Sequence, residues 1–171
     1  MSRIVTALMI VCLTSTVAFG FGTSKFKDEV EKEKGAVKLV RELVRGNYGI
    51  ITTEELDKLI KAGEDVLVID TMPYEASYKK GHIPGAKQFL FPIPEMTEWD
   101  SKETAGKSIE EYRKLLGDDM AKKIVVYCGF VKCTRSHNGA MWAKKLGYTN
   151  VLRHPGGIYA WRGAGLEVAK E

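Results

Sequence analysis

The sequence lacks internal repeats, low-complexity tracts and any basic run interleaved with aromatic residues. These absences argue against a fibrous or disordered protein and give no indication of nucleic-acid binding. The net charge is only +4, and 44% hydrophobic with 28% charged residues is an ordinary globular composition. A chain of 171 residues is long enough for one domain with a real core. The slight positive charge is compatible with a small anion as ligand.

Cysteine is also scarce, with three residues in the whole chain. Cys12 lies in the apolar N-terminal segment, so Cys128 and Cys133 are the cysteines left if that segment is removed. Their Cys-x4-Cys spacing lacks the tight Cys-x-x-Cys pattern of thiol oxidoreductases. Zinc held by this pair and His137 is conceivable by count but weak by spacing. We expect no metal and no organic cofactor.

Residues 1–20 have the features of a secretory signal peptide. Arg3 supplies a positive start, Ile4 to Leu13 an apolar core, and Ala18-Phe19-Gly20 a small-x-small cleavage site. Cleavage near Gly20 predicts a periplasmic or secreted protein, with no stable membrane insertion after the signal is removed. Disulfides can persist in such a compartment. An uncleaved anchor is the alternative, because the apolar character fades slowly after the core.

The segment 21–47 is predicted to be a helical leader. It is dense in lysine and glutamate, and apolar residues recur in its second half at helical spacing: Val37, Val40, Leu43 and Val44. We expect this helix to dock weakly or to act as a spacer, and we assign it no chemistry. The folded domain is predicted to occupy residues 48–171.

Short buried strands alternate with helices in that domain. This order predicts βαβ units, and therefore a parallel sheet that is covered on both faces. The strands are expected at 50–51, 66–69, 124–127 and 151–152. The helices are expected at 54–62, with Thr53 as its cap, at 108–116 and at 136–146.

The strand Ile124 to Tyr127 delivers Cys128 to the carboxyl edge of the sheet, where ligands bind in open parallel sheets. A loop then leads to a helix N-terminus. Converging loop amides, together with the charges of Lys132 and Arg135, should favour the thiolate of Cys128. The same donors are suited to holding an anionic substrate.

Three motifs in the same order resemble those of single-domain rhodaneses, a family of sulfurtransferases. Residues 66–86 read VLVIDTMPYEASYKKGHIPGA, the cysteine loop follows, and residues 151–161 read VLRHPGGIYAW. The resemblance covers roughly residues 50 to 165. It implies a three-layer α/β fold, with a central, mostly parallel sheet and helices on both faces.

The resemblance also implies a double-displacement reaction at Cys128. The thiolate would take the outer sulfur of thiosulfate, a polysulfide or a related small anion, forming a persulfide. A thiol, sulfite, cyanide or a partner protein would then accept this sulfur. The loop predicted to bind the anion and the persulfide consists of Gly129, Phe130, Val131, Lys132, Cys133, Thr134 and Arg135.

Four further residues are expected to be structural neighbours of the site: Asp70, His82, Gly156 and Gly157. We expect His82 and Asp70 to hold the Gly-His-Ile-Pro-Gly turn by hydrogen bonds. The paired glycines permit a tight turn beside the active edge. His154 is expected to be an exposed loop residue, with a position near the mouth of the site as the alternative.

Several other functions stay open. A sulfur carrier that passes sulfane sulfur only to a dedicated partner needs the same cysteine and loop. Cys133 is either a redox partner that forms a disulfide with Cys128 or a small residue that fills space. A related scaffold in certain dual-specificity phosphatases carries Cys-x5-Arg, whereas six residues separate Cys128 from Arg135 here, so we rank phosphatase activity low.

Overall fold

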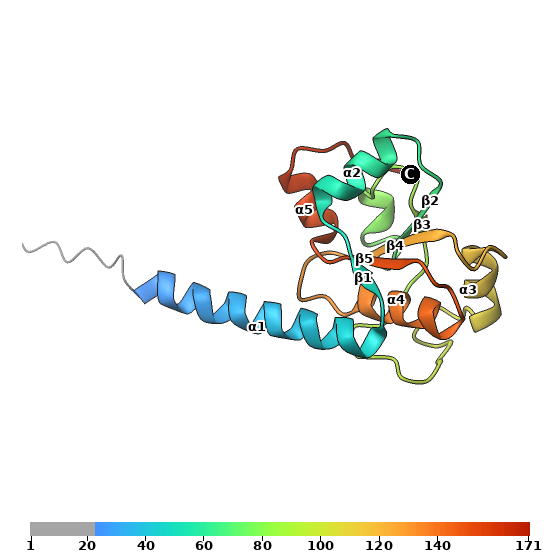
Figure 1. Ribbon diagram of the computed structural model, residues 1–171, viewed down its shortest axis with the longest axis horizontal. Coiled ribbons are helices and arrows are strands. Elements are labelled where there is room, and N and C mark those ends of the chain that lie inside the picture. The colour runs from blue at the N-terminus through green and yellow to red at the C-terminus, as the bar shows by residue number, and fades with distance from the viewer. Residues whose placement is uncertain (1–22) are drawn as a thin grey trace, which may run out of the picture.

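The structure is a computed structural model, and it describes residues 23–171 (Figure 1). The predicted signal peptide, residues 1–20, and its cleavage site near Gly20 lie outside the described residues. No helix within residues 23–171 is long and apolar enough to cross a membrane.

A five-stranded sheet forms the centre of the domain, and every pairing between its neighbouring strands is parallel. The spatial order is β1-β5-β4-β2-β3, which puts β4, the strand that leads to Cys128, in the middle. The strands are β1 (Gly49–Ile50), β2 (Val66–Asp70), β3 (Lys87–Gln88), β4 (Lys123–Tyr127) and β5 (Val151–His154). The prediction of a parallel sheet is confirmed.

Helices cover both faces of this sheet, so the three-layer arrangement is confirmed as well (Figure 1). Helices α3 and α4 pack on one face, whereas α2 and α5 pack on the other. The helices are α1 (Thr23–Gly46), α2 (Thr53–Lys61), the 3-10 helix η1 (Tyr78–Lys80), α3 (Ile109–Leu116), α4 (Arg135–Lys145) and α5 (Gly157–Gly163).

The side chains of β4 are divided between two apolar clusters. Ile124 and Val126 pack with α3 and α4, whereas Val125 and Tyr127 pack with α2 and α5, as the alternation of a strand requires. All four are fully buried. Burying an aliphatic side chain of this size contributes about 1.5–3 kcal/mol, so the strand is firmly held. Its next residue, Cys128, therefore has a well-defined position.

Capping residues set the starts of two helices. Thr52, rather than the predicted Thr53, caps α2, and its side chain forms a capping box with Glu55. Ser108 and Glu111 form the same box at the start of α3, within the helix predicted at 108–116. The error at α2 is one residue, because two consecutive threonines both satisfy the sequence pattern.

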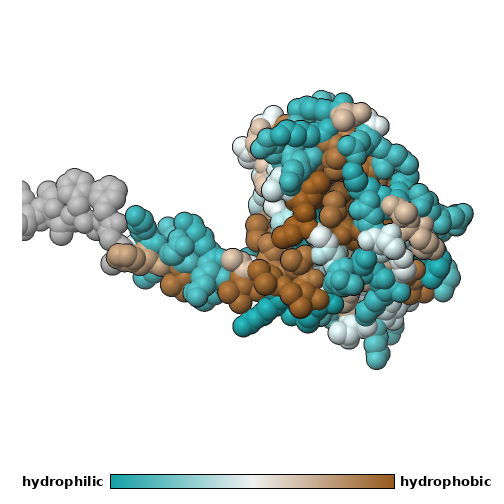
Figure 2. Space-filling view, viewed as in Figure 1, coloured by the Kyte–Doolittle hydropathy of each residue, from teal (hydrophilic) through white to brown (hydrophobic). Residues whose placement is uncertain are grey.

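Helix α1 contacts the domain with its second half, while its first half projects from it (Figure 1). Figure 2 shows apolar surface close to the junction between this helix and the domain. The buried or half-buried positions on α1 are Gly35, Lys38, Leu39, Glu42, Leu43 and Gly46. Val37, Val40 and Val44 are exposed, so the apolar spacing identified the helix but largely indicated the wrong docking face.

Candidate active site

Cys128 follows β4 directly and is fully buried. Its carbonyl oxygen accepts a hydrogen bond from the amide of Ile158 at 2.9 Å, which attaches the end of β4 to α5. Gly157 has a φ of +59°, and a Cβ there would lie 2.3 Å from the same carbonyl oxygen. Gly156 lies directly before this close approach. The paired glycines therefore lie beside Cys128 in the structure, at the sheet edge where the sequence placed them.

Three oxygen atoms surround the sulfur of Cys128. Ser136 Oγ lies 3.1 Å from Sγ, the carbonyl oxygen of Cys133 lies at 3.3 Å, and that of Phe130 lies at 3.9 Å. Ser136 Oγ accepts a hydrogen bond from Arg153 Nε at 2.9 Å, which leaves its own proton free to donate to the sulfur. The Cys128 thiol can in turn donate to the carbonyl oxygens. The site thus supports a protonated sulfur through the carbonyls and a charged one through the hydroxyl.

Arg153 lies beneath the loop, and its side chain is fully buried. Besides Ser136, its guanidinium contacts Glu42 Oε2 at 2.6 Å, Cys133 O at 2.9 Å, Tyr48 OH at 3.3 Å and Val131 O at 3.4 Å. One cation therefore joins β5, helix α1 and two carbonyls of the cysteine loop. Removing one partner of a buried ion pair typically costs about 3–5 kcal/mol, because the other charge stays buried.

Glu42 is the buried anion of this pair, with 1% of its surface exposed. Burial by itself would raise its pKa, but the hydrogen bond and the charge of Arg153 outweigh that effect and lower the pKa below its usual value. The carboxylate is therefore ionised at neutral pH. Helix α1, to which we assigned no chemistry, supplies the counter-charge beneath the cysteine loop.

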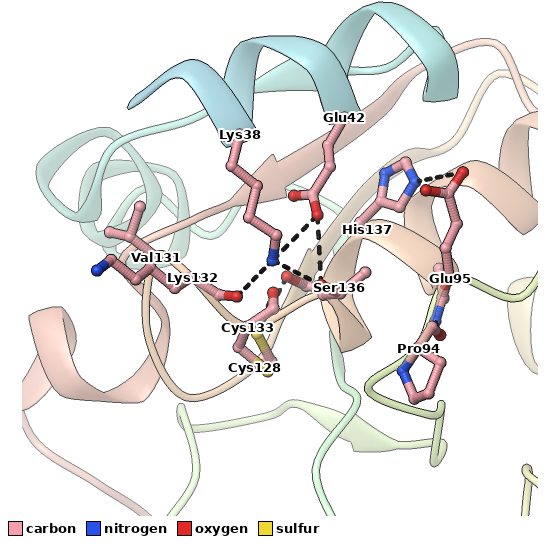
Figure 3. A network of polar contacts seen from close by, with 12 residues as sticks. Lys38, Glu42, Pro94, Glu95, Cys128, Val131, Lys132, Cys133, Ser136 and His137 are labelled. Carbon is pink, nitrogen blue, oxygen red and sulfur yellow. Dashed lines mark hydrogen bonds and ion pairs between the residues drawn. The ribbon is translucent and has the colours of Figure 1, made fainter. Parts of the chain in front are cut away.

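Lys38 makes a second connection from α1 to the loop. Its ammonium donates to Lys132 O at 2.5 Å and to Thr134 Oγ1 at 2.6 Å, and it lies 3.2 Å from Glu42 Oε1. Figure 3 shows Lys38 and Glu42 pointing from the helix toward the loop and toward Ser136. Different helices therefore hold the two ends of the loop. Helix α5 holds its start at Cys128, and helix α1 holds its end, just before α4.

Lys132 and Arg135 do not bring their charges to Cys128, contrary to prediction. The ammonium of Lys132 pairs with Glu31 of α1 at 2.5 Å on the surface. The guanidinium of Arg135 donates to the carbonyl oxygen of Phe91. Arg153, which the sequence analysis left without a role, is the buried cation nearest to this chemistry.

Both Cys128 and Cys133 are free thiols. Burial, followed by the hydrogen bond to Cys133, raises the pKa of Cys128. The hydrogen bond from Cys128, followed by the backbone amides of Arg135 and Gly129, lowers the pKa of Cys133. Burial therefore opposes the expected thiolate of Cys128 in the resting site, and the amides of Gly129 and Arg135 favour the thiolate of Cys133 instead.

The remaining loop residues form an apolar rim. Phe130 and Val131 are 46% and 41% exposed. The ring of Phe130 packs on Tyr159 of α5 with 5.5 Å between the ring centroids, and Gly129 O accepts a hydrogen bond from the amide of Tyr159. The exposed side chains of this part of the loop are therefore apolar.

Asp70 and His82 stabilise the neighbouring turn, but not by bonding to each other. Asp70 accepts hydrogen bonds from the amide of Met72 at 2.8 Å and from Tyr127, while burial raises its pKa to about 6. His82 Nδ1 bonds to the carbonyl oxygen of Tyr78 at 2.9 Å, and the two rings stack with 3.9 Å between their centroids. His82 therefore bonds to the backbone next to its own turn, whereas Asp70 bonds to the backbone that follows β2.

His154 and His137 do not occupy the positions that the sequence analysis considered for them. His154 is buried in β5 with 1% exposure, so it is not the exposed loop residue that we expected. His137 lies against Tyr48 OH at 2.8 Å and Glu95 Oε1 at 3.7 Å, and it does not complete a zinc site with the cysteines. Within residues 23–171, no group of three metal-ligating side chains is found.

Four important side chains had no role in the sequence analysis: Lys38, Glu42, Ser136 and Arg153. The sequence did contain one indication of the role of Arg153. It interrupts a short buried strand, and a charged residue in a central strand requires a buried partner of opposite charge. Nothing local to the strand indicates that this partner lies in α1, more than a hundred residues earlier.

Comparisons with known proteins agree with this fold. The Rhodanese-like domain family matches residues 52–164. A thiosulfate sulfurtransferase from Pseudomonas aeruginosa is similar in structure, with a TM-score of 0.56 and 21% identity, over 78% of this chain and 22% of that longer chain. A comparison with curated proteins found no match.

Two further solved structures are similar. A polysulfide-sulfur transferase homodimer from Wolinella succinogenes has a TM-score of 0.53 and 15% identity, over 82% of this chain and 90% of that one. A protein of unknown function from Rhodopseudomonas palustris, described as a possible tyrosine phosphatase, has a TM-score of 0.53 and 26% identity, over 77% and 93%. The family match extends over more than half of the chain, and the chain belongs to the rhodanese-like domain family.

Proposed function

We propose that the protein is a sulfurtransferase that moves sulfane sulfur from thiosulfate, a polysulfide or a related anion through a persulfide on Cys128. One observation carries this proposal: a buried cysteine at the carboxyl end of the central strand faces a hydroxyl donor and a closed loop. Membership of the rhodanese-like family supports the same chemistry. A thiol, sulfite, cyanide or a partner protein serves as acceptor.

The first step forms the persulfide. The thiol of Cys128 loses its proton to solvent, and the resulting thiolate attacks the outer sulfur of thiosulfate. The bond between the two thiosulfate sulfurs breaks, and sulfite leaves with the electron pair. The Ser136 hydroxyl, oriented by Arg153, donates to the sulfur as negative charge develops.

Intact mass spectrometry of the reduced protein after incubation with thiosulfate or polysulfide tests this proposal. We expect a gain of sulfur that disappears in Cys128→Ser. Thr149→Ser is a matched control far from the loop, and it should gain sulfur like the wild type. Retention of the gain in Cys128→Ser would refute the assignment of the nucleophile.

Turnover separates an enzyme from a carrier. If cyanide removes the sulfur repeatedly and forms thiocyanate at a steady rate, the protein is a catalyst. A single stoichiometric loading without turnover would instead indicate the sulfur-carrier alternative.

Phosphatase activity receives no support from the site. The guanidinium of Arg135 is directed at the carbonyl oxygen of Phe91, and that of Arg153 is neutralised by Glu42. Neither is positioned to cradle a phosphate above Cys128.

We also propose that the protein is exported to the periplasm or secreted, on the basis of the signal-like residues 1–20. N-terminal sequencing of the mature protein tests this, and a start immediately after Gly20 is the expected result.

A further inference from the structure

The second cysteine lies in direct contact with the first. The carbonyl oxygen of Cys133 is 3.3 Å from Cys128 Sγ, and both cysteines are free thiols. The amide of Cys133 donates to Phe130 O at 3.0 Å, which folds the loop back over Cys128. Figure 3 shows the two cysteines side by side beneath the polar network from α1. Cys133 is therefore a direct neighbour of the residue that would carry the added sulfur.

Exposure to solvent differs between the two cysteines. Cys128 has no exposed surface, whereas 8% of Cys133 is exposed. Cys133 is therefore the residue nearer to solvent. A thiol held within the same loop also reacts as an intramolecular partner, which gives it a large effective concentration.

We propose that Cys133 attacks the persulfide of Cys128 and releases hydrosulfide, so that the protein also performs a reductive cleavage of sulfane sulfur. This inference rests on the proposed function, because the persulfide must form first. Its product is a disulfide between Cys128 and Cys133.

The reaction balances without an added oxidant. After sulfite has left, Cys128 carries a persulfide anion and Cys133 a thiol. The sulfur of Cys133 bonds to the inner sulfur of the persulfide, the bond between inner and outer sulfur breaks, and the outer sulfur leaves with the electron pair and the proton of Cys133 as hydrosulfide. Over both steps together, the sulfane sulfur gains two electrons and leaves as hydrosulfide, and the two thiols lose them in forming the disulfide.

The surroundings of Cys133 favour this attack. The backbone amides of Arg135 and Gly129 help to lower the pKa of Cys133, which favours its thiolate. Arg153 holds the Cys133 carbonyl at 2.9 Å, which fixes the residue over the site. A dithiol reductant reopens the disulfide and returns the protein to its starting state.

A single-turnover experiment without oxygen tests the proposal. Reduced protein, freed of small thiols, is mixed with thiosulfate, and sulfite, hydrosulfide and protein mass are measured together. We expect the wild type to release one equivalent each of sulfite and hydrosulfide and to lose two hydrogen atoms. Protein kept without thiosulfate should retain both thiols, which excludes oxidation by traces of oxygen.

The matched variant is Cys133→Ser. We expect it to release sulfite and to retain one added sulfur atom on Cys128, with hydrosulfide release at least about a hundredfold slower. That retained sulfur also shows that the variant site is folded.

Two results separate the possible failures. If wild type and Cys133→Ser both retain the added sulfur and release no hydrosulfide, the resolving role is wrong while the sulfurtransferase proposal stands. If neither protein releases sulfite or gains sulfur, the proposed function fails, and the inference fails with it.

Discussion

The two halves of helix α1 differ in how deeply their ion pairs are buried, although both halves are rich in charged residues. The largely free half, residues 23–34, meets the cysteine loop through the surface pair of Glu31 with Lys132. In this half, the ion pair between Lys32 and Glu29 is formed by side chains that are 72% and 74% exposed. In the docked half, residues 35–46, the pair between Glu42 and Arg153 is buried, with 2% and 0% exposed. Exposed pairs contribute about 0–1 kcal/mol, whereas breaking a buried pair costs several times more. The pattern of charges in the sequence therefore does not show which half contributes to the stability of the domain.

The docked half also extends the site beyond the family domain. The matched residues are 52–164, so Lys38 and Glu42 lie outside them. Both side chains nevertheless contact groups in the cysteine loop or its supporting arginine. We infer that the loop in this protein depends on the preceding helix, and the predictions below test the difference between its two halves.

The largest effect is expected for Glu42→Gln. The substitution keeps the shape of the side chain but leaves the Arg153 guanidinium buried without its counter-charge. We expect the free energy of unfolding to fall by about 3 kcal/mol, measured by urea denaturation. Sulfur uptake should also slow, because Arg153 holds Ser136 and the Cys133 carbonyl.

Glu29→Gln is the matched control in the free half. Its carboxylate makes an exposed contact with Lys32, so the stability change should stay within about 0.5 kcal/mol. Equal losses in the two variants would contradict the assignment of separate roles to the two halves.

The central domain was more predictable than this helix contact. Runs of β-branched residues in β2 and β4, with Cys128 after the second, predicted the strands and the cysteine edge correctly. These features depend on residues close together in the sequence. The Glu42–Arg153 pair joins residues that are 111 positions apart, and its formation depends on how α1 packs on α4.

The chemistry of the loop was only partly predictable for a related reason. The sequence shows which cations lie near Cys128 in the chain, and it therefore favoured Lys132 and Arg135. Their long side chains instead reach Glu31 and the carbonyl oxygen of Phe91. The direction of a side chain depends on tertiary partners, which residue spacing does not specify.

The pH dependence of stability should separate the buried pair from exposed ones. The pKa of Glu42 is lowered in the fold, so its contribution is fully present above its unfolded pKa and is lost as pH falls through the folded pKa. We expect the stability difference between wild type and Glu42→Gln to shrink as pH falls from about 7 to about 3. Urea denaturation at several pH values measures it, and a difference that stays constant would contradict a charged Glu42.

A smaller effect is expected for Lys38→Met. This variant loses the contacts to Lys132 O and Thr134 Oγ1, but it retains the apolar stem of the side chain. Because 40% of the Lys38 side chain is exposed, we expect a loss of about 1 kcal/mol or less. Amide hydrogen exchange in residues 129–134 should increase, since the ammonium attaches this segment to α1. Unchanged exchange there would show that Arg153 alone holds the loop.

The smallest effect is expected for Phe26→Ala in the free half. The ring is 71% exposed, and alanine has a higher helix propensity, so the stability should change by about 0.5 kcal/mol at most. Leu43→Ala is the matched apolar truncation in the docked half, where the side chain packs against the core, and it should cost about 1–2 kcal/mol. Urea denaturation compares the two at several protein concentrations. A loss for Phe26→Ala as large as that for Leu43→Ala, and dependent on concentration, would mean that the free half is covered in solution by a second copy of the chain.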